Sequence, residues 1–180
     1  MGQAAPAPST SRTIQWFRDL ALSVIIALIV ILFLYQPVRV EGTSMMPALV
    51  DQERIFINKF SYRFGFTDIN RFDTVVFWYP GDTSKSYIKR IIGMPGDIVE
   101  ISRGRVFVNG QELTELYGPD DYRDRASMDK MRVGEHEYFV LGDHRSSSND
   151  SRTWGVVPRG FIYGKAVFSY WPLDRLGTVR

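Results

Sequence analysis

The chain has 180 residues, which is enough for one domain of common size and a short additional segment. Its formal net charge is only +2, and Lys and Arg are scattered among acidic residues, so the composition argues against nucleic acid as a partner. Cysteine is absent, which excludes disulfides, thiolate catalysis and cysteine zinc sites. The two histidines form no HExxH motif, and we expect neither a metal nor another cofactor.

The first predicted elements are a polar tail and an apolar helix. Residues 1–13 begin with small residues, Pro and Ser, which is typical of a disordered tail. The run from Leu20 to Tyr35 is uncharged and nearly all aliphatic, and Trp16 and Phe17 extend it upstream. Such a run forms about 24 Å of helix, slightly less than the hydrocarbon core of about 30 Å. We therefore predict a transmembrane helix over residues 14–36, which Pro37 would end.

This helix has two alternative interpretations. A cleaved secretory signal usually has a shorter apolar run and a small-x-small cleavage site, and "QPVRVEG" contains no such site. A helix buried in a protein core would need helical partners, which the rest of the chain does not predict. An uncleaved signal anchor is the favoured reading. Arg12 and Arg18 before the run balance Arg39 and Arg54 after it, so charge alone leaves the orientation open.

The remaining residues, 37–180, predict an all-β domain. Short runs rich in β-branched and aromatic residues alternate with turns, and Asn109-Gly110 has the type I′ hairpin signature. The stretch 112–133 is charged and weakly patterned, so we expect a long loop there, with a short helix around 123–131. The predicted strands are 54–59, 74–79, 86–92, 97–101, 105–109, 138–142 and 161–171.

Three sparse features suggest chemistry. Ser44 lies in "GTSMMP", where Gly42 permits close approach of the backbone and Pro47 restricts the chain, so the loop could hold a hydroxyl rigidly. Lys89 lies in "SYIKRII", where each face of a strand would carry one cation among apolar residues, so we expect one of the two cations to have apolar surroundings. The loop 142–155 is dense in polar side chains, and it is either a buried network or an ordinary surface loop.

If Ser44 is a nucleophile, its base is either Lys89 or His144. An exposed lysine with a pKa near 10.4 is neutral in only about one molecule in a thousand at pH 7.5. Burial would have to lower that pKa by roughly three units. A Ser-His-Asp triad would use His144 with Asp143, but side chains of adjacent residues rarely orient each other. We therefore favour the lysine.

The motifs together resemble the type I signal peptidases, which are membrane-bound serine proteases. "GTSMMPAL" (42–49) is similar to the serine box of that family, and "RFDTVVF" (71–77) to its conserved strand. "YIKRIIGMPGD" (87–97) resembles the lysine box, and "GDHRSSSNDSRTWGVVP" (142–158) the C-terminal box. The hairpin "GRVFVNGQEL" is also similar. The resemblance runs from about residue 16 to residue 172, with the four motifs in the family's order.

The resemblance implies coiled antiparallel β-sheets of the type shared with self-cleaving repressors, and a Ser44–Lys89 dyad that forms an acyl-enzyme. The substrates would be preproteins cleaved after Ala-x-Ala. It also implies that Ser148 orients the lysine amine, with the loop supported by Asp143, Arg145, Asp150 and Arg152. Residues that match the family's substrate pocket are Val40, Met45, Leu49, Tyr87 and Ile88.

The chain departs from the family pattern at two places. Gly42 replaces a serine that helps some members bind the oxyanion, so the backbone N–H of Ser44 would need another donor. His144, Ser146 and Ser147 replace the usual Asn, Asp and Asn of the last box, which leaves the details of loop support open.

The resemblance also implies a cytoplasmic tail, a single anchor and a catalytic domain on the outer face of the cytoplasmic membrane. The lipid bilayer would be a partner, and no motif points to a component of the export machinery. Some of the aromatic residues Phe60, Tyr62, Phe64 and Phe66 could enter the membrane interface or belong to a core strand.

Two other functions remain alternatives. A self-cleaving repressor would share the chemistry, but it would carry a DNA-binding helix-turn-helix and an Ala-Gly cleavage bond, and this chain has neither. An inert anchored β-domain that binds preproteins would have no need for both Ser44 and Lys89.

Overall fold

The structure is a computed structural model that describes residues 10–60, 68–115 and 120–179. It divides into two compact units, Met1–Leu34 and Tyr35–Arg180, and each is described by itself. Residues 1–9 of the predicted tail lie outside the described residues, as do Tyr62, Phe64 and Phe66.

The first unit is the helix α1 (Thr10–Leu34). Its apolar side chains are exposed over the described stretch, with Trp16, Phe17 and Ile29 each at about three-fifths of their full accessibility. The side chains at 30–33 lie outside the described residues. Among the residues that are described, no helix has both the length and the apolar character needed to cross a membrane. The helix begins before the predicted residue 14 and stops before residue 36, because Tyr35 and Gln36 pair with a strand instead.

The second unit is built on a large antiparallel sheet, which confirms the predicted β fold. The sheet order is β1-β2-β11-β3-β4-β9-β10, with β12 paired to β11. Its strands are β1 (Tyr35–Arg39), β2 (Arg54–Asn58), β3 (Thr74–Tyr79), β4 (Asp82–Gly93), β9 (Glu137–Leu141), β10 (Val157–Pro158), β11 (Ile162–Trp171) and β12 (Gly177–Thr178). All seven strands that the sequence predicted are present, with ends shifted by a few residues.

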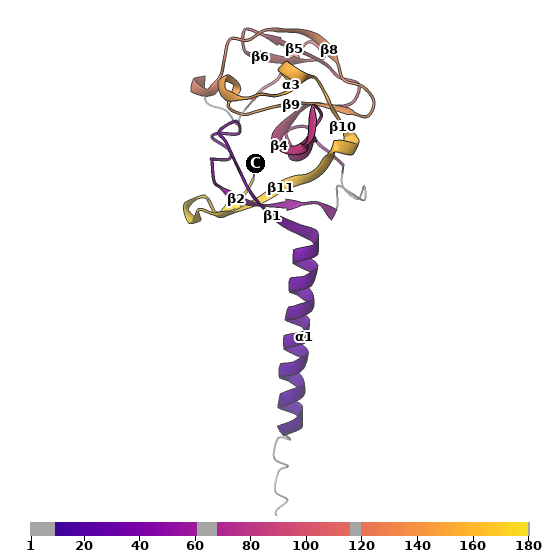
Figure 1. The fold of residues 1–180 in the computed structure, drawn as a ribbon, viewed down its shortest axis with the longest axis vertical. Helices are drawn as coiled ribbons and strands as arrows, with labels where there is room; N and C mark the ends of the chain where they lie inside the picture. The colour runs from indigo at the N-terminus through magenta and orange to yellow at the C-terminus, as the bar shows by residue number, and fades with distance from the viewer. Residues whose placement is uncertain (1–9, 61–67, 116–119, 180) are drawn as a thin grey trace, which may run out of the picture. The chain divides into compact units, whose positions relative to one another are not determined.

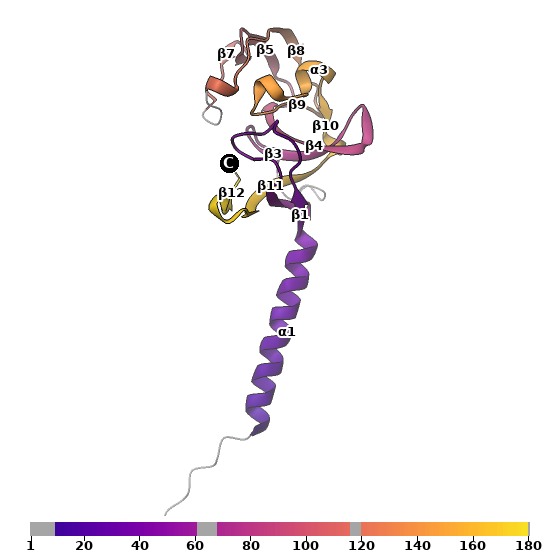
Figure 2. The same cartoon turned by 60° about the vertical axis from the view of Figure 1, so that its left-hand side comes forward.

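A smaller sheet has the order β7-β6-β5-β8. Its strands are β5 (Ile98–Ser102), β6 (Arg105–Val108), β7 (Gln111–Glu112) and β8 (Met128–Arg132). Asn109 and Gly110 both have positive φ, 54° and 81°, as the type I′ turn between β6 and β7 requires. Within this unit, the small sheet lies at the opposite end from β1, β2 and β11 (Figures 1 and 2).

Strands β3, β4 and β9 are apolar on both faces because they separate hydrophobic cores. In β4, Ile91 belongs to a core shared with Val75 and Phe77, whereas the next residue, Ile92, belongs to a second core under the small sheet. In β3, Val76 points into a third core, which contains Met45 and Leu49 from the loop after β1. This position places residues 89 and 90 of β4 inside the protein on opposite faces.

The predicted helix around 123–131 is wrong. The structure has a 3₁₀ turn, η1 (Asp120–Tyr122), followed by strand β8. Met128 and Met131 pack against the second core and pair with β5, while the charged side chains between them face solvent at the sheet edge. The remaining short helices are η2 (Arg145–Ser147), α3 (Ser151–Trp154), η3 (Arg159–Phe161) and η4 (Leu173–Arg175).

Candidate active site

Ser44 lies in the loop between β1 and β2. Backbone hydrogen bonds within this loop hold its conformation. The amide of Val40 donates to the carbonyl of Glu53 at 2.8 Å, and the amide of Leu49 donates to the carbonyl of Met45 at 2.9 Å. Gly42 has φ +89°, and a Cβ placed there would meet nothing within 4 Å. The glycine therefore serves a left-handed backbone conformation, and the close approach predicted for it is wrong.

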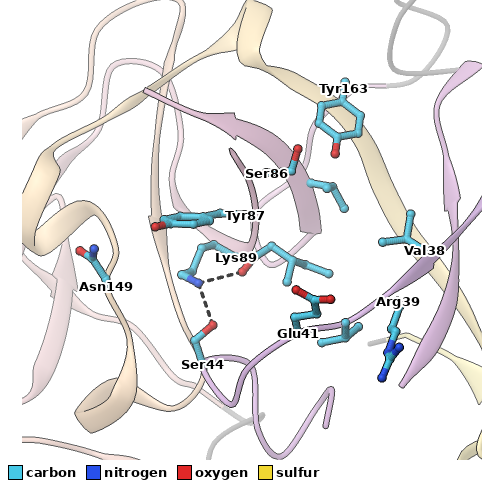
Figure 3. Close-up of a pocket in the computed structure, with 12 residues that line it drawn as sticks. Val38, Arg39, Glu41, Ser44, Ser86, Tyr87, Lys89, Asn149 and Tyr163 are labelled. Carbon is cyan, nitrogen blue, oxygen red and sulfur yellow. Dashed lines mark hydrogen bonds between the residues drawn. The ribbon is translucent and has the colours of Figure 1, made fainter. Parts of the chain in front are cut away.

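Lys89 of β4 meets this loop. Its Nζ donates to Ser44 Oγ at 2.8 Å and to the carbonyl oxygen of Ile88 at 3.0 Å, as Figure 3 shows. The two residues are 45 positions apart in the chain. The lysine is only 4% exposed. The fold thus buries an amine against a hydroxyl.

Burial lowers the pKa of Lys89 to about 8, and the negative charges of Asp150 and Asp143 oppose this shift. With that pKa, about a quarter of the molecules hold a neutral amine at pH 7.5. The ring of Tyr87 lies 5.4 Å from Nζ and stacks on Tyr79 at 4.8 Å between centroids. The Tyr87 ring therefore covers one side of the amine.

The neighbouring cation, Arg90, has a different environment. Its Nε and Nη2 donate to the two carboxylate oxygens of Asp143 at 2.8 and 2.6 Å, and both side chains are almost completely buried. Burial raises the pKa of Asp143, and the contact with Arg90 opposes that rise. The prediction that one cation of this strand has apolar surroundings fits Lys89, whereas Arg90 is buried against a carboxylate. Sequence reasoning gave Arg90 no role, although its place in an apolar strand was the available signal.

The loop 142–155 is a network of buried ions. Asp150 accepts from the amide of Gly142 at 3.0 Å and from Arg152 Nε at 2.8 Å, and it caps the short helix α3. Arg145 Nε donates to the carbonyl of Gly142 at 3.0 Å. Two carboxylates from another segment complete the network: Glu115 contacts Arg145 and Asp124 contacts Arg152. The sequence did not predict Glu115 and Asp124, because nothing local marks them.

A cavity of about 320 Å³ opens beside the Ser44–Lys89 contact. Of the five residues predicted for the substrate pocket, Val40, Tyr87 and Ile88 line it. Met45 and Leu49, which belong to the same loop as Ser44, are instead buried in the third core. The other lining residues are Val38, Arg39, Glu41, Ser44, Val76, Ser86, Lys89, Asn149 and Tyr163. In Figure 3, Tyr87 and Asn149 lie on the amine side of this cavity.

The sequence profile of a protein family described as "Signal peptidase, peptidase S26" matches residues 13–171. The chain belongs to this family. A signal peptidase I of Leptolyngbya laminosa is 36% identical over 98% of this chain and 88% of its own length. A signal peptidase I P of Bacillus subtilis subsp. natto is 36% identical over 92% of this chain and 93% of its own length. A crystal structure of a signal peptidase I from Enterococcus faecalis, 31% identical, covers 55% of this chain and 97% of that chain, with a TM-score of 0.48.

A type I signal peptidase is a serine endopeptidase, and the removal of signal peptides is the activity of the family to which the chain belongs. The two candidate bases have different positions relative to the serine. Lys89 contacts Ser44 Oγ directly, whereas His144 Nδ1 lies 3.3 Å from the carbonyl oxygen of Thr43 and its ring packs edge-on against Tyr122. The backbone amide of His144 donates to the carbonyl of Ser44 at 3.0 Å.

Ser148 does not make the hydrogen bond that the signal peptidase resemblance implies. Its Oγ is buried and has no hydrogen-bond partner among the described residues. It lies against Gly142, where an added Cβ would come within 2.2 Å of it. Of the other four loop residues of the prediction, Asp150 and Arg152 contact each other, whereas Asp143 pairs with Arg90 and Arg145 pairs with Glu115.

Proposed function

We propose that the chain cleaves signal peptides through a Ser44–Lys89 dyad. The supporting observation is the 2.8 Å contact between Ser44 Oγ and the buried Lys89 Nζ, whose pKa is lowered to about 8. The neutral amine takes the proton of Ser44, and Oγ attacks the carbonyl carbon of the scissile bond. The resulting ammonium gives its proton to the leaving amine, which leaves an acyl-enzyme. The neutral Lys89 amine then takes a proton from water, the hydroxide attacks the acyl carbon, and the ammonium returns the proton to Ser44 Oγ as the acid is released.

The surroundings of His144 favour this assignment over a Ser-His-Asp triad. A triad histidine has one nitrogen at the serine and the other at a carboxylate. The carboxylate nearest to His144 in the sequence is that of Asp143, and both of its oxygens accept hydrogen bonds from Arg90. The ring of His144 contacts the Thr43 carbonyl and Tyr122 instead.

The cavity supports cleavage after small residues such as those of Ala-x-Ala. Its lining includes the branched or aromatic side chains of Val40, Tyr87 and Ile88 together with Ser44, and such side chains favour small substrate residues. Among the strands of the described residues, residues 86–88 of β4 pair only with β3, and β1 is an edge strand of its sheet. An extended substrate can therefore hydrogen-bond to a free strand edge while its alternate side chains enter the cavity.

We further propose that α1 anchors the protein in the cytoplasmic membrane, with the β unit on the outer face. The support is the uncharged run from Leu20 to Tyr35 and the exposure of apolar residues along the described part of the helix. Long domains are translocated largely regardless of flanking charge, so the balanced arginines allow this orientation. Preproteins and the lipid bilayer would be the partners.

The test is cleavage of a signal-bearing preprotein, followed by mass spectrometry of the products. The Ser44→Ala and Lys89→Met variants should leave the preprotein intact. The His144→Ala variant should cut at the same bond as the unmodified chain. Full activity of the Lys89 variant together with loss in the His144 variant would reverse the assignment. The anchor is tested by carbonate extraction of membranes from cells that express the full chain. We expect the protein to stay in the membrane pellet.

A further inference from the structure

The loop that carries Asp143 to Trp154 positions the backbone of the nucleophile. The amide of His144 donates to the Ser44 carbonyl at 3.0 Å. At Gly142 the loop lies so close that an added Cβ would be 2.5 Å from the same carbonyl oxygen. Lys89 lies on strand β4, which meets the start of this loop through the Arg90–Asp143 pair, so a shift of the loop about that pair moves Ser44 relative to its base.

Two buried guanidinium groups hold the loop in shape. Arg145, 6% exposed, donates from Nε to the Gly142 carbonyl at 3.0 Å. Arg152 donates from Nη2 to the Arg145 carbonyl at 2.8 Å and from Nε to Asp150 at 2.8 Å. The position of the loop therefore depends on where these two cations are fixed.

Each cation also contacts a carboxylate from a segment outside the loop. Arg145 binds both oxygens of Glu115, and the two side chains are 5% and 7% exposed. Arg152 Nη1 binds Asp124, with the side chains 12% and 23% exposed. We name Glu115 and Asp124 the carboxylate clamp. Charged groups as deeply buried as Arg145 and Glu115 are costly unless they are paired, so this pair is a specific arrangement and not a chance surface contact; the pair Arg152–Asp124 is partly exposed.

The residues on either side of the clamp are anchored in the small sheet. The amide of Leu113 donates to the Val106 carbonyl at 2.8 Å, and the amide of Gly104 donates to the Ala126 carbonyl at 2.8 Å. A Cβ added at Gly104 would lie 2.0 Å from the carbonyl oxygen of Asp124, so the turn between β5 and β6 fits closely against this part of the chain. Both Figures 1 and 2 show α3 of the loop beside the small sheet. A series of contacts therefore leads from the small sheet through the carboxylate clamp and the loop 142–155 to Ser44.

We propose that Glu115 and Asp124 are positioning residues for the acylation step. They act through Arg145 and Arg152, which set the loop, and the loop sets the Ser44 carbonyl and hence the distance from Oγ to Lys89. This inference depends on the proposed dyad. It assigns the otherwise unexplained small sheet and the segment that follows it a part in the positioning of the nucleophile, although none of their described residues lines the cavity.

The experiment uses the full chain in detergent micelles, with a synthetic signal-peptide substrate and a serine-directed acylating probe. The variants are Glu115→Gln and Asp124→Asn, which keep size and remove charge. The matched control is Glu112→Gln, which removes the carboxylate of the exposed pair Arg105–Glu112, whose side chains are 64% and 48% exposed. Near-ultraviolet circular dichroism and the final extent of probe labelling report the folded fraction.

We expect Glu115→Gln to lower kcat and the rate of probe acylation about tenfold to a hundredfold, with KM within about twofold, since small misplacements of reacting groups have effects of this size. Asp124→Asn should show the same pattern more weakly, because its pair is less buried. Glu115→Asp should recover part of the loss, and Glu112→Gln should match the unmodified chain.

Acylation at the unmodified rate in folded Glu115→Gln and Asp124→Asn would overturn the inference, and so would a loss that merely equals the unfolded fraction. If Glu115→Gln does not fold, Asp124→Asn decides between these outcomes. A different result marks failure of the proposed function itself: the unmodified chain is not labelled at Ser44, or Lys89→Met is labelled as fast as the unmodified chain.

Discussion

Lys89 and Arg90 are neighbours on strand β4, and the protein treats them in opposite ways. Both are buried, at 4% and 1% exposure, on opposite faces of the strand. Arg90 meets a carboxylate that accepts from two of its nitrogens, whereas Lys89 meets a hydroxyl and a backbone carbonyl. A guanidinium stays charged and needs a counter-ion, but an amine can lose its proton. Lys89 is a candidate base because its direct contacts are a hydroxyl and a carbonyl and not a counter-ion, so that its amine can become neutral.

We expect the largest effect on activity when Lys89 is replaced by arginine, the residue type found at position 90. Lys89→Arg keeps a long cationic side chain but cannot become neutral, so we expect preprotein cleavage to fall by about a thousandfold or more. The measurement is kcat/KM on a signal-peptide substrate. Arg18→Lys, on an exposed part of α1, is the matched control for a change between the two cations. Appreciable activity of Lys89→Arg would mean that residue 89 is not the base.

The second experiment removes the counter-ion pair on the other face. Arg90→Met leaves the Asp143 carboxylate buried without its bidentate partner, and we expect the free energy of unfolding to fall by about 3 to 5 kcal/mol. Urea denaturation followed by tryptophan fluorescence measures it. Arg105→Met, in an exposed pair, should change stability by less than about 1 kcal/mol. Equal effects of the two substitutions would contradict the contrast drawn between buried and exposed pairs.

The pH dependence of activity follows from the lowered pKa of Lys89. Because the neutral amine is the active form, activity should rise with pH through about 8 and level off above it. Between pH 7 and pH 9 the neutral fraction rises about tenfold. Initial rates of peptide cleavage across this range provide the test. A profile that is flat from pH 6 to pH 10 would argue against a titrating lysine.

The smallest expected effect comes from placing a carboxylate near Lys89, as Asp143 already lies beside Arg90. Asn149 lines the same cavity, and an Asn149→Asp substitution adds a carboxylate there. A nearby negative charge stabilises the ammonium form and raises the pKa of the lysine. The rising limb of the pH profile should move to higher pH, with activity at pH 7 reduced about threefold to tenfold and recovered at high pH. Asn149→Ser, which adds no charge, should leave the limb in place.

Several features of the protein were readable from the sequence because they depend on near neighbours. β-branched runs and the Asn109-Gly110 turn predict their strands and hairpin, since their backbone preferences are local. Ser44 and Lys89 were identified as a candidate pair from their motifs. The charged stretch that forms β8 was misread, because the two methionines that pack inward are spaced among exposed charges and only pairing with β5 defines their face.

The sequence by itself therefore determined seven of the strands, the type of sheet, the apolar N-terminal run and the identity of the two groups that could react. Tertiary structure decided which cation of β4 receives a carboxylate, that Met45 and Leu49 belong to the core, and that Glu115 and Asp124 reach the loop beside the serine. The physical reason is the difference in how far along the chain each property depends on other residues. Backbone preference is set within a few residues, whereas the pKa of an amine and the partner of a buried ion depend on groups that only folding brings within hydrogen-bonding distance.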